Sequence, residues 1–202
     1  MKLTLEQGRE LVEYARKVIE GHYSNKKLDV PDNLWEAFKE ELGVFVTLHS
    51  HPGRRLRGCI GFPEPVMPFG DAVRQAALAA ALADPRFPPV DEPETKKLVV
   101  EVSLLTKPEL IRVKDAREYP EKVEVGVDGL IVEKGYSRGL LLPQVAVEHG
   151  WSSQEFLSET CMKAGLNPNA WLVPGTKVHK FSTQIFSEER PGGRVAEKKP
   201  TA

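Results

Sequence analysis

The sequence predicts an α+β fold in which a largely antiparallel sheet is flanked by helices. Candidate strands occur as hairpins, in which two alternating segments are joined by a short turn, and stretches with helical spacing lie between them. No glycine-rich phosphate loop and no dinucleotide-binding fingerprint is present, which argues against a doubly wound parallel sheet. At 202 residues the chain is long enough for one well-buried domain and too short for two large ones.

Composition and charge are those of an ordinary globular protein, with 41% hydrophobic residues and a net charge of -1. These values exclude a disordered acidic chain and a strongly basic nucleic-acid binder, so we expect no nucleic-acid partner. No apolar run of about 18 residues and no secretory signal after Met1 occurs, so we expect a cytoplasmic protein without a membrane partner. The two cysteines, Cys59 and Cys161, lack Cys-x-x-Cys spacing, so we expect free thiols and no structural zinc.

Two helices and a hairpin are predicted in the first third of the chain. Residues 4–7 form a capping box that begins a helix of about 15 residues, which ends near Gly21. A second, shorter helix begins at Pro31 and ends before Gly43. Residues 44–49 and 54–61 then alternate in polarity around the turn-forming residues 50–53, which predicts a β-hairpin.

The register of this hairpin follows from the requirement that one face be apolar. A loop with an odd number of residues pairs Phe45, Thr47 and His49 with Cys59, Arg57 and Arg55, respectively. The other face then carries only apolar residues and a glycine, namely Val44, Val46, Leu48, Leu56, Gly58 and Ile60.

The middle of the chain alternates between proline-rich segments and regular elements. Three prolines in residues 62–68 predict a rigid loop, and Asp71 caps an alanine-rich helix over 72–82. Residues 84–90 are either a rigid connector or a second wall of the site. Residues 98–105 form a strand whose less apolar face carries Glu101 and Ser103.

In the last third, Asp128-Gly129 is the strongest hairpin signal and joins strands over 123–127 and 130–133. A further strand is indicated at 140–142. Ser152 begins a second capping box, and the helix that follows ends before Gly165 and turns Cys161 toward the core. A late strand covers 178–186, and the polar residues 187–202 are expected to form a mobile tail.

The hairpin is also where chemistry is expected. Arg55, Arg57 and Cys59 share one strand face, and neighbours on such a face lie about 7 Å apart. A guanidinium at that distance favours the thiolate, so the sequence predicts a lowered pKa for Cys59. Gly58 and Gly61 indicate a bulge or a close approach of another group.

These motifs resemble those of the AMMECR domain family, named for a protein encoded in the AMME-syndrome chromosomal region. The resemblance rests on residues 56–61, which match the hallmark hexapeptide completely, and on residues 84–89, 129–132 and 138–146, followed by Trp151 and Cys161. It implies an AMMECR-type domain over 1–190, a tail over 191–202, and two unequal lobes with the hexapeptide near the cleft between them. The family's activity is not established, and similar proteins accompany Memo-type and radical S-adenosylmethionine proteins, which are possible partners by resemblance.

Several functions stay open from the sequence. One is an enzyme that uses Cys59 with Arg57 and with His49 as base, for which His149 and His179 are more distant alternatives. Another is a non-catalytic module that recognises an anionic ligand or partner protein through the arginine-rich strand. Local RNA binding is disfavoured by the charge balance, and each cysteine or histidine can also be structural.

Ligand-binding candidates are Arg55, Gly58, Gly61, Asp84, Arg86 and Gln144. No metal site is predicted, because Pro52 interrupts the strand that would align His49 with His51. No cofactor is indicated.

Overall fold

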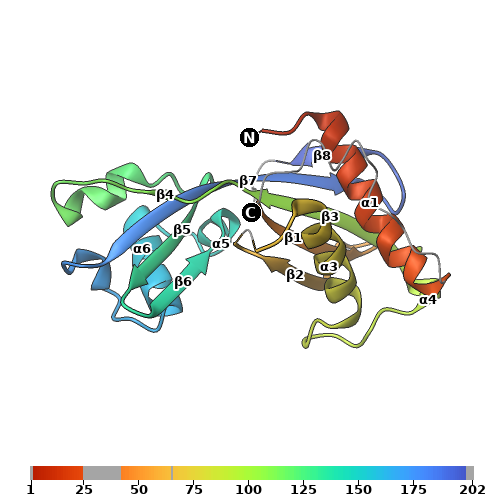
Figure 1. Ribbon diagram of the computed structural model, residues 1–202, viewed down its shortest axis with the longest axis horizontal. Helices are drawn as coiled ribbons and strands as arrows, with labels where there is room; N and C mark the ends of the chain where they lie inside the picture. The colour runs from red at the N-terminus through yellow and green to blue at the C-terminus, as the bar shows by residue number, and fades with distance from the viewer. Residues whose placement is uncertain (1, 25–41, 65, 199–202) are drawn as a thin grey trace. The chain divides into compact units, whose positions relative to one another are not determined.

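The computed structural model describes residues 2–24, 42–64 and 66–198. The chain divides into two compact units (Figure 1). Unit 1 holds the described residues up to Leu105 and those from Gln184 on, and unit 2 holds Thr106–Thr183. The pairings of β1 with β2 and β3, of β5 with β6 and β7, and of β7 with β4 and β8 are antiparallel, and helices flank the strands, so the predicted α+β class is confirmed.

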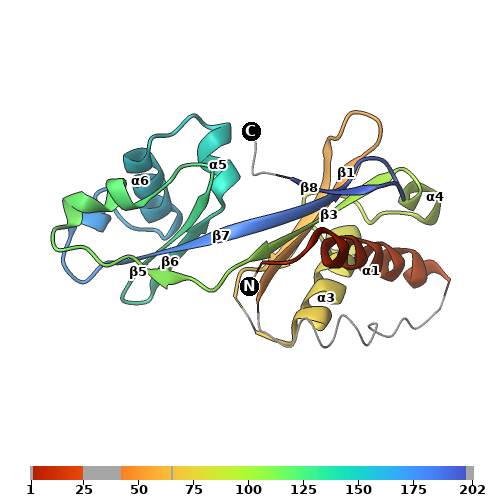
Figure 2. The ribbon, with the colours of Figure 1, turned by 90° about the horizontal axis from the view of Figure 1, so that it is seen from above.

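Unit 1 is a sheet covered on one face by two helices. Its strands follow the order β2 (Leu56–Phe62), β1 (Gly43–Ser50), β3 (Leu98–Leu105) and the end of β7 (Lys177–Glu188), with β8 (Val195–Lys198) paired to β7. Helices α1 (Leu5–Tyr23) and α3 (Phe69–Leu82) lie on the same side of this sheet, and the short α4 (Glu92–Thr95) precedes β3 (Figure 2). The hydrophobic core of the unit lies between these helices and the sheet.

The capping box at Thr4 begins α1 as predicted. The Thr4 hydroxyl accepts a hydrogen bond from the Gln7 backbone, and the Gln7 side chain accepts one from the Thr4 backbone, so two otherwise unpaired N–H groups are satisfied. The helix continues two residues beyond the predicted Gly21. The helix predicted to begin at Pro31 lies outside the described residues.

The hairpin of β1 and β2 has the predicted faces but a different register. Thr47 lies opposite Cys59, not Arg57, so the predicted pairing is wrong by two residues. A shift of two preserves the side-chain alternation, which is why Val44, Val46 and Leu48 are buried under the helices as expected. A bulge between Leu48 and His49 then changes the pairing at the end of the hairpin.

The bulge also explains why Leu56 is exposed. This residue was predicted on the apolar face, but it pairs with His49 beyond the bulge and is 41% exposed. The prediction for Leu56 is therefore wrong, because strict alternation does not continue across the irregularity.

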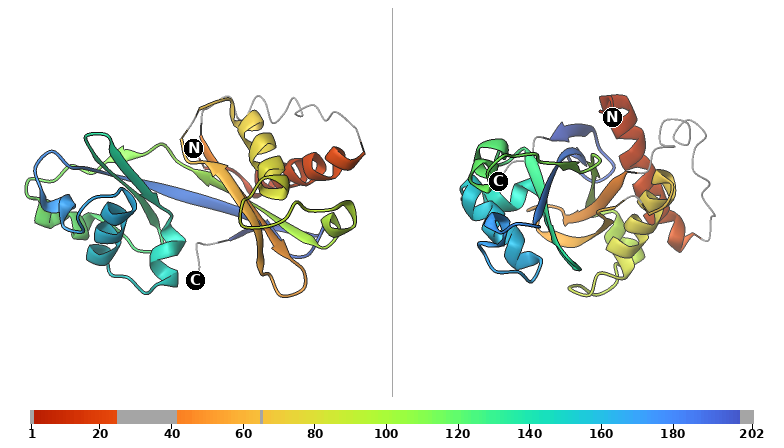
Figure 3. Two further views of the ribbon diagram at one scale, coloured as in Figure 1. Left: turned by 90° about the horizontal axis from the view of Figure 1, so that it is seen from below. Right: turned by 60° about the vertical axis from the view of Figure 1, so that its left-hand side comes forward.

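Unit 2 is a smaller antiparallel sheet packed against helices. The first part of β7 pairs with β4 (Glu109–Leu110) on one side and with β5 (Asp128–Lys134) on the other, and β5 pairs with β6 (Ser137–Leu141). Helices α5 (Pro143–Glu148) and α6 (Ser153–Lys163) and the 3-10 helices η1 (Ala116–Lys122) and η2 (Ala170–Leu172) complete the unit. Figure 3 shows α6 beside the β5–β6 hairpin, and the side chain of Cys161 is fully buried there, as predicted.

The hairpin predicted at Asp128-Gly129 is wrong. Residues 123–127 form no strand: residues 125–127 lie in a turn, and the Asp128 carboxylate closes that turn by accepting a hydrogen bond from the Glu124 backbone at 2.9 Å. Gly129 lies inside β5, where an added Cβ would come within 2.3 Å of the Phe181 ring. The glycine is therefore required by packing rather than by a turn, and the hairpin turn lies between β5 and β6.

The C-terminal residues also differ from the expected mobile tail. Strand β7 continues to Glu188, and Val195–Lys198 returns as β8 beside it. Val195 is buried in the core of unit 1. A single buried residue in a short polar strand leaves too weak a pattern for the sequence to reveal. Within the described ranges, no helix is long and apolar enough to cross a membrane.

Candidate functional site

Cys59 lies on the face of the unit 1 sheet that is turned away from α1 and α3. Gly58, its neighbour, points toward α3, where an added Cβ would come within 2.1 Å of the Ala80 carbonyl oxygen. Alternation therefore turns Cys59 to the opposite face. On that face Thr47 of β1 lies between Cys59 of β2 and Glu101 of β3, because Thr47 is the register partner of both. We call Cys59, Thr47 and Glu101 the polar row.

Thr47 and Cys59 are in direct contact. The Thr47 hydroxyl donates a hydrogen bond to the Cys59 sulfur at 3.2 Å. The backbone groups of Cys59 bond to side chains outside β1, which makes the two residues a non-hydrogen-bonded pair, the kind whose side chains approach most closely. The hairpin register thus places a donor beside the thiol.

The pKa of Cys59 is raised, contrary to the prediction. Burial of the half-buried thiol is the main cause, and the carboxylates of Asp84 and Glu101 add to it, whereas the Thr47 hydrogen bond and the Arg86 charge act in the opposite direction. Cys59 is therefore a neutral thiol near pH 7. The sequence argument failed because it considered the arginines in the strand but neither the burial of the thiol nor the acids that other segments bring near it.

Asp84 and Arg86 hold the backbone of Cys59. The Asp84 carboxylate accepts a hydrogen bond from the Cys59 N–H at 2.8 Å, and the Arg86 guanidinium donates to the Cys59 carbonyl oxygen at 3.1 Å. The two side chains also bind each other through two N–H···O contacts of 2.9 and 2.7 Å. These hydrogen bonds from Arg86 are the main reason why the pKa of the buried Asp84 is well below its usual range. The segment 84–90 is thus neither a mere connector nor distant from Cys59.

Arg57 is engaged elsewhere. Its guanidinium donates to both carboxylate oxygens of Glu94 in α4, at 2.6 and 2.9 Å, and lies 5.9 Å from the centre of the Phe87 ring. The bidentate pair with Glu94 neutralises most of the Arg57 charge, which the sequence argument had expected to favour the Cys59 thiolate. The Nη1 atom of Arg57 is buried and has no hydrogen-bond partner among the described residues.

Glu101 is the centre of a second set of contacts. Its carboxylate oxygens lie 3.8 Å from His49 Nε2 and 3.6 Å from the Lys198 ammonium. Burial opposes ionisation of Glu101, but hydrogen bonding and charge from His49, together with Lys198 and Ser187, lower its pKa overall. The carboxylate is therefore charged at neutral pH although its side chain is only 16% exposed.

His49 lies at the end of β1, beside Glu101. Its Nδ1 atom lies 3.3 Å from the Arg54 carbonyl oxygen, a contact that requires a proton on Nδ1. The other ring nitrogen, Nε2, is the atom that faces Glu101.

The remaining candidates occupy varied positions. Arg55 is exposed, and Gly61 packs so tightly that an added Cβ would come within 2.2 Å of the Val44 carbonyl oxygen. Gln144 belongs to α5 of unit 2, where its Oε1 atom is buried without a partner among the described residues. His149, also in unit 2, stacks on Trp151 at 4.6 Å.

Sequence reasoning missed Thr47, Glu94 and Lys198 as members of this region. Glu101 had been assigned to the less apolar face of its strand, which was the available signal, but its place beside Thr47 required the alignment of β1 with β3. Lys198 lies in the strand that was not predicted. Of the described residues, no group of three His, Cys, Asp or Glu side chains is arranged to hold a metal ion.

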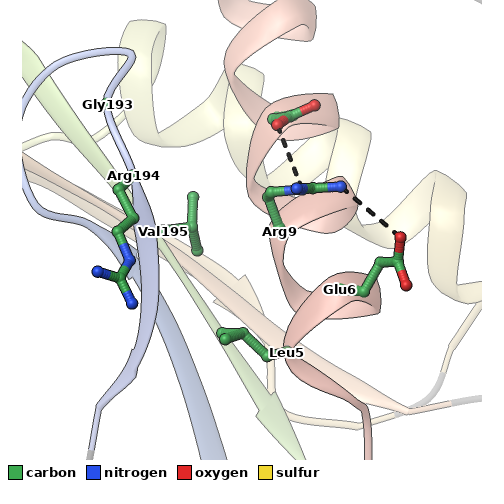
Figure 4. A pocket seen from close by; sticks show the side chains of 7 residues that line it. Leu5, Glu6, Arg9, Gly193, Arg194 and Val195 are labelled. Carbon is green, nitrogen blue, oxygen red and sulfur yellow. Dashed lines mark ion pairs between the residues drawn. The ribbon is translucent and has the colours of Figure 1, made fainter.

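A separate pocket of about 560 Å³ lies between α1 and the turn before β8, also in unit 1 (Figure 4). Two arginines and two glutamates face it, and Arg9 lies 3.8 Å from both Glu6 and Glu13. None of the site residues predicted from the sequence lines this pocket, whose lining consists of Leu5, Glu6, Arg9, Glu13, Gly193, Arg194 and Val195. Cys59 and the residues around it thus lie outside this pocket.

The model of the AMMECR1 family matches residues 12–186. The chain belongs to the AMMECR1 family. Protein MJ0810 of Methanocaldococcus jannaschii is 54% identical over 197 residues, which cover 98% of each chain, and Protein PF1979 of Pyrococcus furiosus is 53% identical over 201 residues, which cover 96% of this chain and 93% of that one. The crystal structure of the uncharacterized protein PH0010 from Pyrococcus horikoshii is 50% identical, with a TM-score of 0.87, and covers 98% of this chain and 100% of that one.

The AMMECR1 match includes the Cys59 hexapeptide, the Asp84–Arg86 segment and Glu101. The relatives named above carry no stated activity. Function must therefore be argued from the chemistry of the site itself.

Proposed function

We propose that this AMMECR1-family protein is an enzyme in which the Cys59 thiol adds to a polarised double bond. The observation that supports the proposal is the polar row, in which a thiol, a hydroxyl and an ionised carboxylate occupy adjacent strands in register. A sulfur that only fills space needs neither a hydroxyl donor nor a charged carboxylate beside it, because a buried cysteine packs as a small hydrophobe.

The resting thiol must lose its proton to act as a nucleophile. In the proposed step the S–H bond breaks and the proton moves to the Glu101 carboxylate, which lies two strands from Cys59 with Thr47 between them. The sulfur electron pair forms the new S–C bond, the electron pair of the double bond moves to its far atom, and that atom takes the proton back. Thr47 stabilises the transient thiolate through the hydrogen bond that it already donates to sulfur.

Asp84 and Arg86 fix the position of the nucleophile. A catalytic group has to be held close to its productive geometry, and side chains are positioned best when the backbone that carries them is rigid. The Asp84–Arg86 pair binds both backbone groups of Cys59 itself. We also propose a cytoplasmic location, where reducing conditions keep Cys59 and Cys161 as the free thiols that the structure contains.

The test is the pH dependence of alkylation by iodoacetamide, measured separately at Cys59 and Cys161 by mass spectrometry. We expect Cys59 to react faster than Cys161 at pH 7, because Cys161 is fully buried. If Glu101 accepts the proton, the Cys59 rate keeps a plateau below its thiol pKa, and Glu101→Gln removes this plateau and slows the reaction at pH 6 by tenfold or more. Glu13→Gln, an exposed change on α1 of the same unit, is the matched control.

Two results would overturn the proposal. If Cys59 reacts only when the protein unfolds, the thiol is a packing residue. If Glu101→Gln merely shifts the whole profile to lower pH without loss of a plateau, Glu101 acts on the thiol through its charge alone and is not the proton acceptor.

A further inference from the structure

Glu101 has a contact from the far end of the chain. Its carboxylate lies 3.6 Å from the Lys198 ammonium of β8, the strand that pairs with the end of β7. The Glu101 side chain is 16% exposed and that of Lys198 is 34% exposed, so water reaches this pair only in part. A carboxylate in such a place stays charged only where cations or hydrogen-bond donors compensate for the lost water.

The groups around Glu101 do not compensate its charge equally. His49 Nε2 of β1 lies 3.8 Å away, and the Ser187 hydroxyl of β7 also favours the charged form. The guanidinium of Arg54 is bound to a hydroxyl and a carbonyl of β7, and the other members of the polar row carry no positive charge. Imidazoles lose their positive charge between pH 5 and 8, whereas ammonium groups keep it. Among the described contacts of Glu101, Lys198 is therefore the cation that persists at neutral pH.

The strand that carries Lys198 is short. β8 has four residues, of which only Val195 is buried. Beside its ladder with β7, the Gln184 side chain donates a hydrogen bond to the Glu197 carboxylate at 2.9 Å, at an exposed position. Segments with few buried side chains open at a lower free-energy cost than the core of a domain. The cation beside Glu101 thus comes from an element that can detach while the rest of unit 1 stays folded.

We infer that Lys198 is a positioning residue for the Cys59 site, which it completes by keeping Glu101 ionised only while β8 is paired with β7. This inference rests on the proposed function, in which Glu101 accepts the thiol proton. It makes the C-terminal strand a regulatory element of the site. Detachment of β8 removes the cation, so Glu101 takes up a proton at a higher pH and can then accept none from the thiol.

The experiment follows the titration of Glu101 by NMR of isotopically labelled glutamate, with the signal assigned through its loss in Glu101→Gln. An opposite charge in close contact lowers the pKa of a carboxyl group by about one to three units. Because Lys198 is partly hydrated, we expect the Glu101 midpoint to rise by about one pH unit in Lys198→Met, near the low end of that range. Lys198→Arg should restore the wild-type midpoint, and Lys17→Met, an exposed change on α1, should leave it unaltered.

Val195→Asp tests the role of β8 while Lys198 stays in the chain. A charge at this buried position should detach the strand, so the Glu101 midpoint should rise as it does in Lys198→Met. In both variants the plateau in Cys59 alkylation should end at a correspondingly higher pH than in wild type. The Lys198 variants decide the inference if Val195→Asp does not fold.

The outcomes separate this inference from the proposed function. A Glu101 midpoint that Lys198→Met leaves unchanged would overturn the inference, even where Cys59 alkylation keeps a plateau that depends on Glu101. A folded Val195→Asp protein with the wild-type midpoint would overturn the regulatory role of β8. Failure of Cys59 to react before unfolding would overturn the proposed function, and with it the positioning role of Lys198, whatever the Glu101 midpoint does.

Discussion

Replacement of Asp84 by asparagine tests whether the pair with Arg86 stabilises the fold. The Asp84 side chain is 2% exposed and accepts hydrogen bonds from the Cys59 N–H and from three N–H groups of Arg86. Breaking a fully buried ion pair costs about 3–5 kcal/mol. The Arg86 side chain is 52% exposed and regains water when it is released, so we expect a smaller loss of about 2 kcal/mol in the free energy of unfolding at pH 7.

The assay is thermal unfolding followed by circular dichroism at several pH values. A loss of about 2 kcal/mol corresponds to a decrease in Tm of about 4–8 °C for a chain of this size. Because the folded-state pKa of Asp84 is lowered, its stabilisation is complete above the unfolded-state pKa of about 3.9 and decreases as the pH falls below that value. The difference between wild type and Asp84→Asn should therefore shrink below pH 4.

Asp115→Asn is a matched control within the same chain. Asp115 and Arg117 have the same spacing and the same contacts, with the carboxylate bound to both the backbone and the side chain of the arginine. This pair is exposed, so we expect no measurable change in Tm. An Asp84→Asn protein as stable as wild type at pH 7, or a difference that stays constant down to pH 2.5, would refute the reasoning.

Three further changes have defined outcomes. Gly58→Ala should lower the free energy of unfolding by about 1–3 kcal/mol in urea titrations, because its Cβ would collide with the Ala80 carbonyl and displace α3; an unchanged midpoint would contradict this. Deletion of residues 189–202 should lower the Tm by several degrees, because it removes β8 and the buried Val195, and a Tm equal to that of wild type would indicate that β8 is dispensable. Thr47→Val should raise the alkylation midpoint of Cys59, because it removes a hydrogen bond that lowers the thiol pKa, and a midpoint that falls would exclude this role.

Local signals in the sequence were enough for several elements. The capping boxes at Thr4 and Ser152 begin helices in the structure, and the strand predicted over 98–105 has the same bounds there. These successes share a cause, since each depends on residues within one or two turns or on alternation along one segment. The burial of Cys161 followed from helical periodicity in the same way.

Relations between segments were harder to predict. Alternation determines which residues share a face but not which of two registers, two residues apart, is adopted, so Cys59 was paired with Phe45 rather than Thr47. The raised pKa of Cys59 depends mainly on the burial of the thiol and also on acids from β3 and from the segment after α3. Asp128 resembled a hairpin residue, but its carboxylate closes a different turn. The sequence of a strand does not show which carboxylates other segments of the chain place beside it.

The contacts of Asp84 and Arg86 have a consequence for assembly. β2 is the last strand of its sheet, and the N–H and carbonyl of Cys59 are groups that a strand from another molecule would pair with. The Asp84 carboxylate accepts the hydrogen bond from the Cys59 N–H that a carbonyl of such a strand would otherwise accept. The Arg86 guanidinium donates to the Cys59 carbonyl, as an N–H group of that strand would do. Two side chains thus take the place of a neighbouring strand, and at this position the sheet ends without an open edge for aggregation.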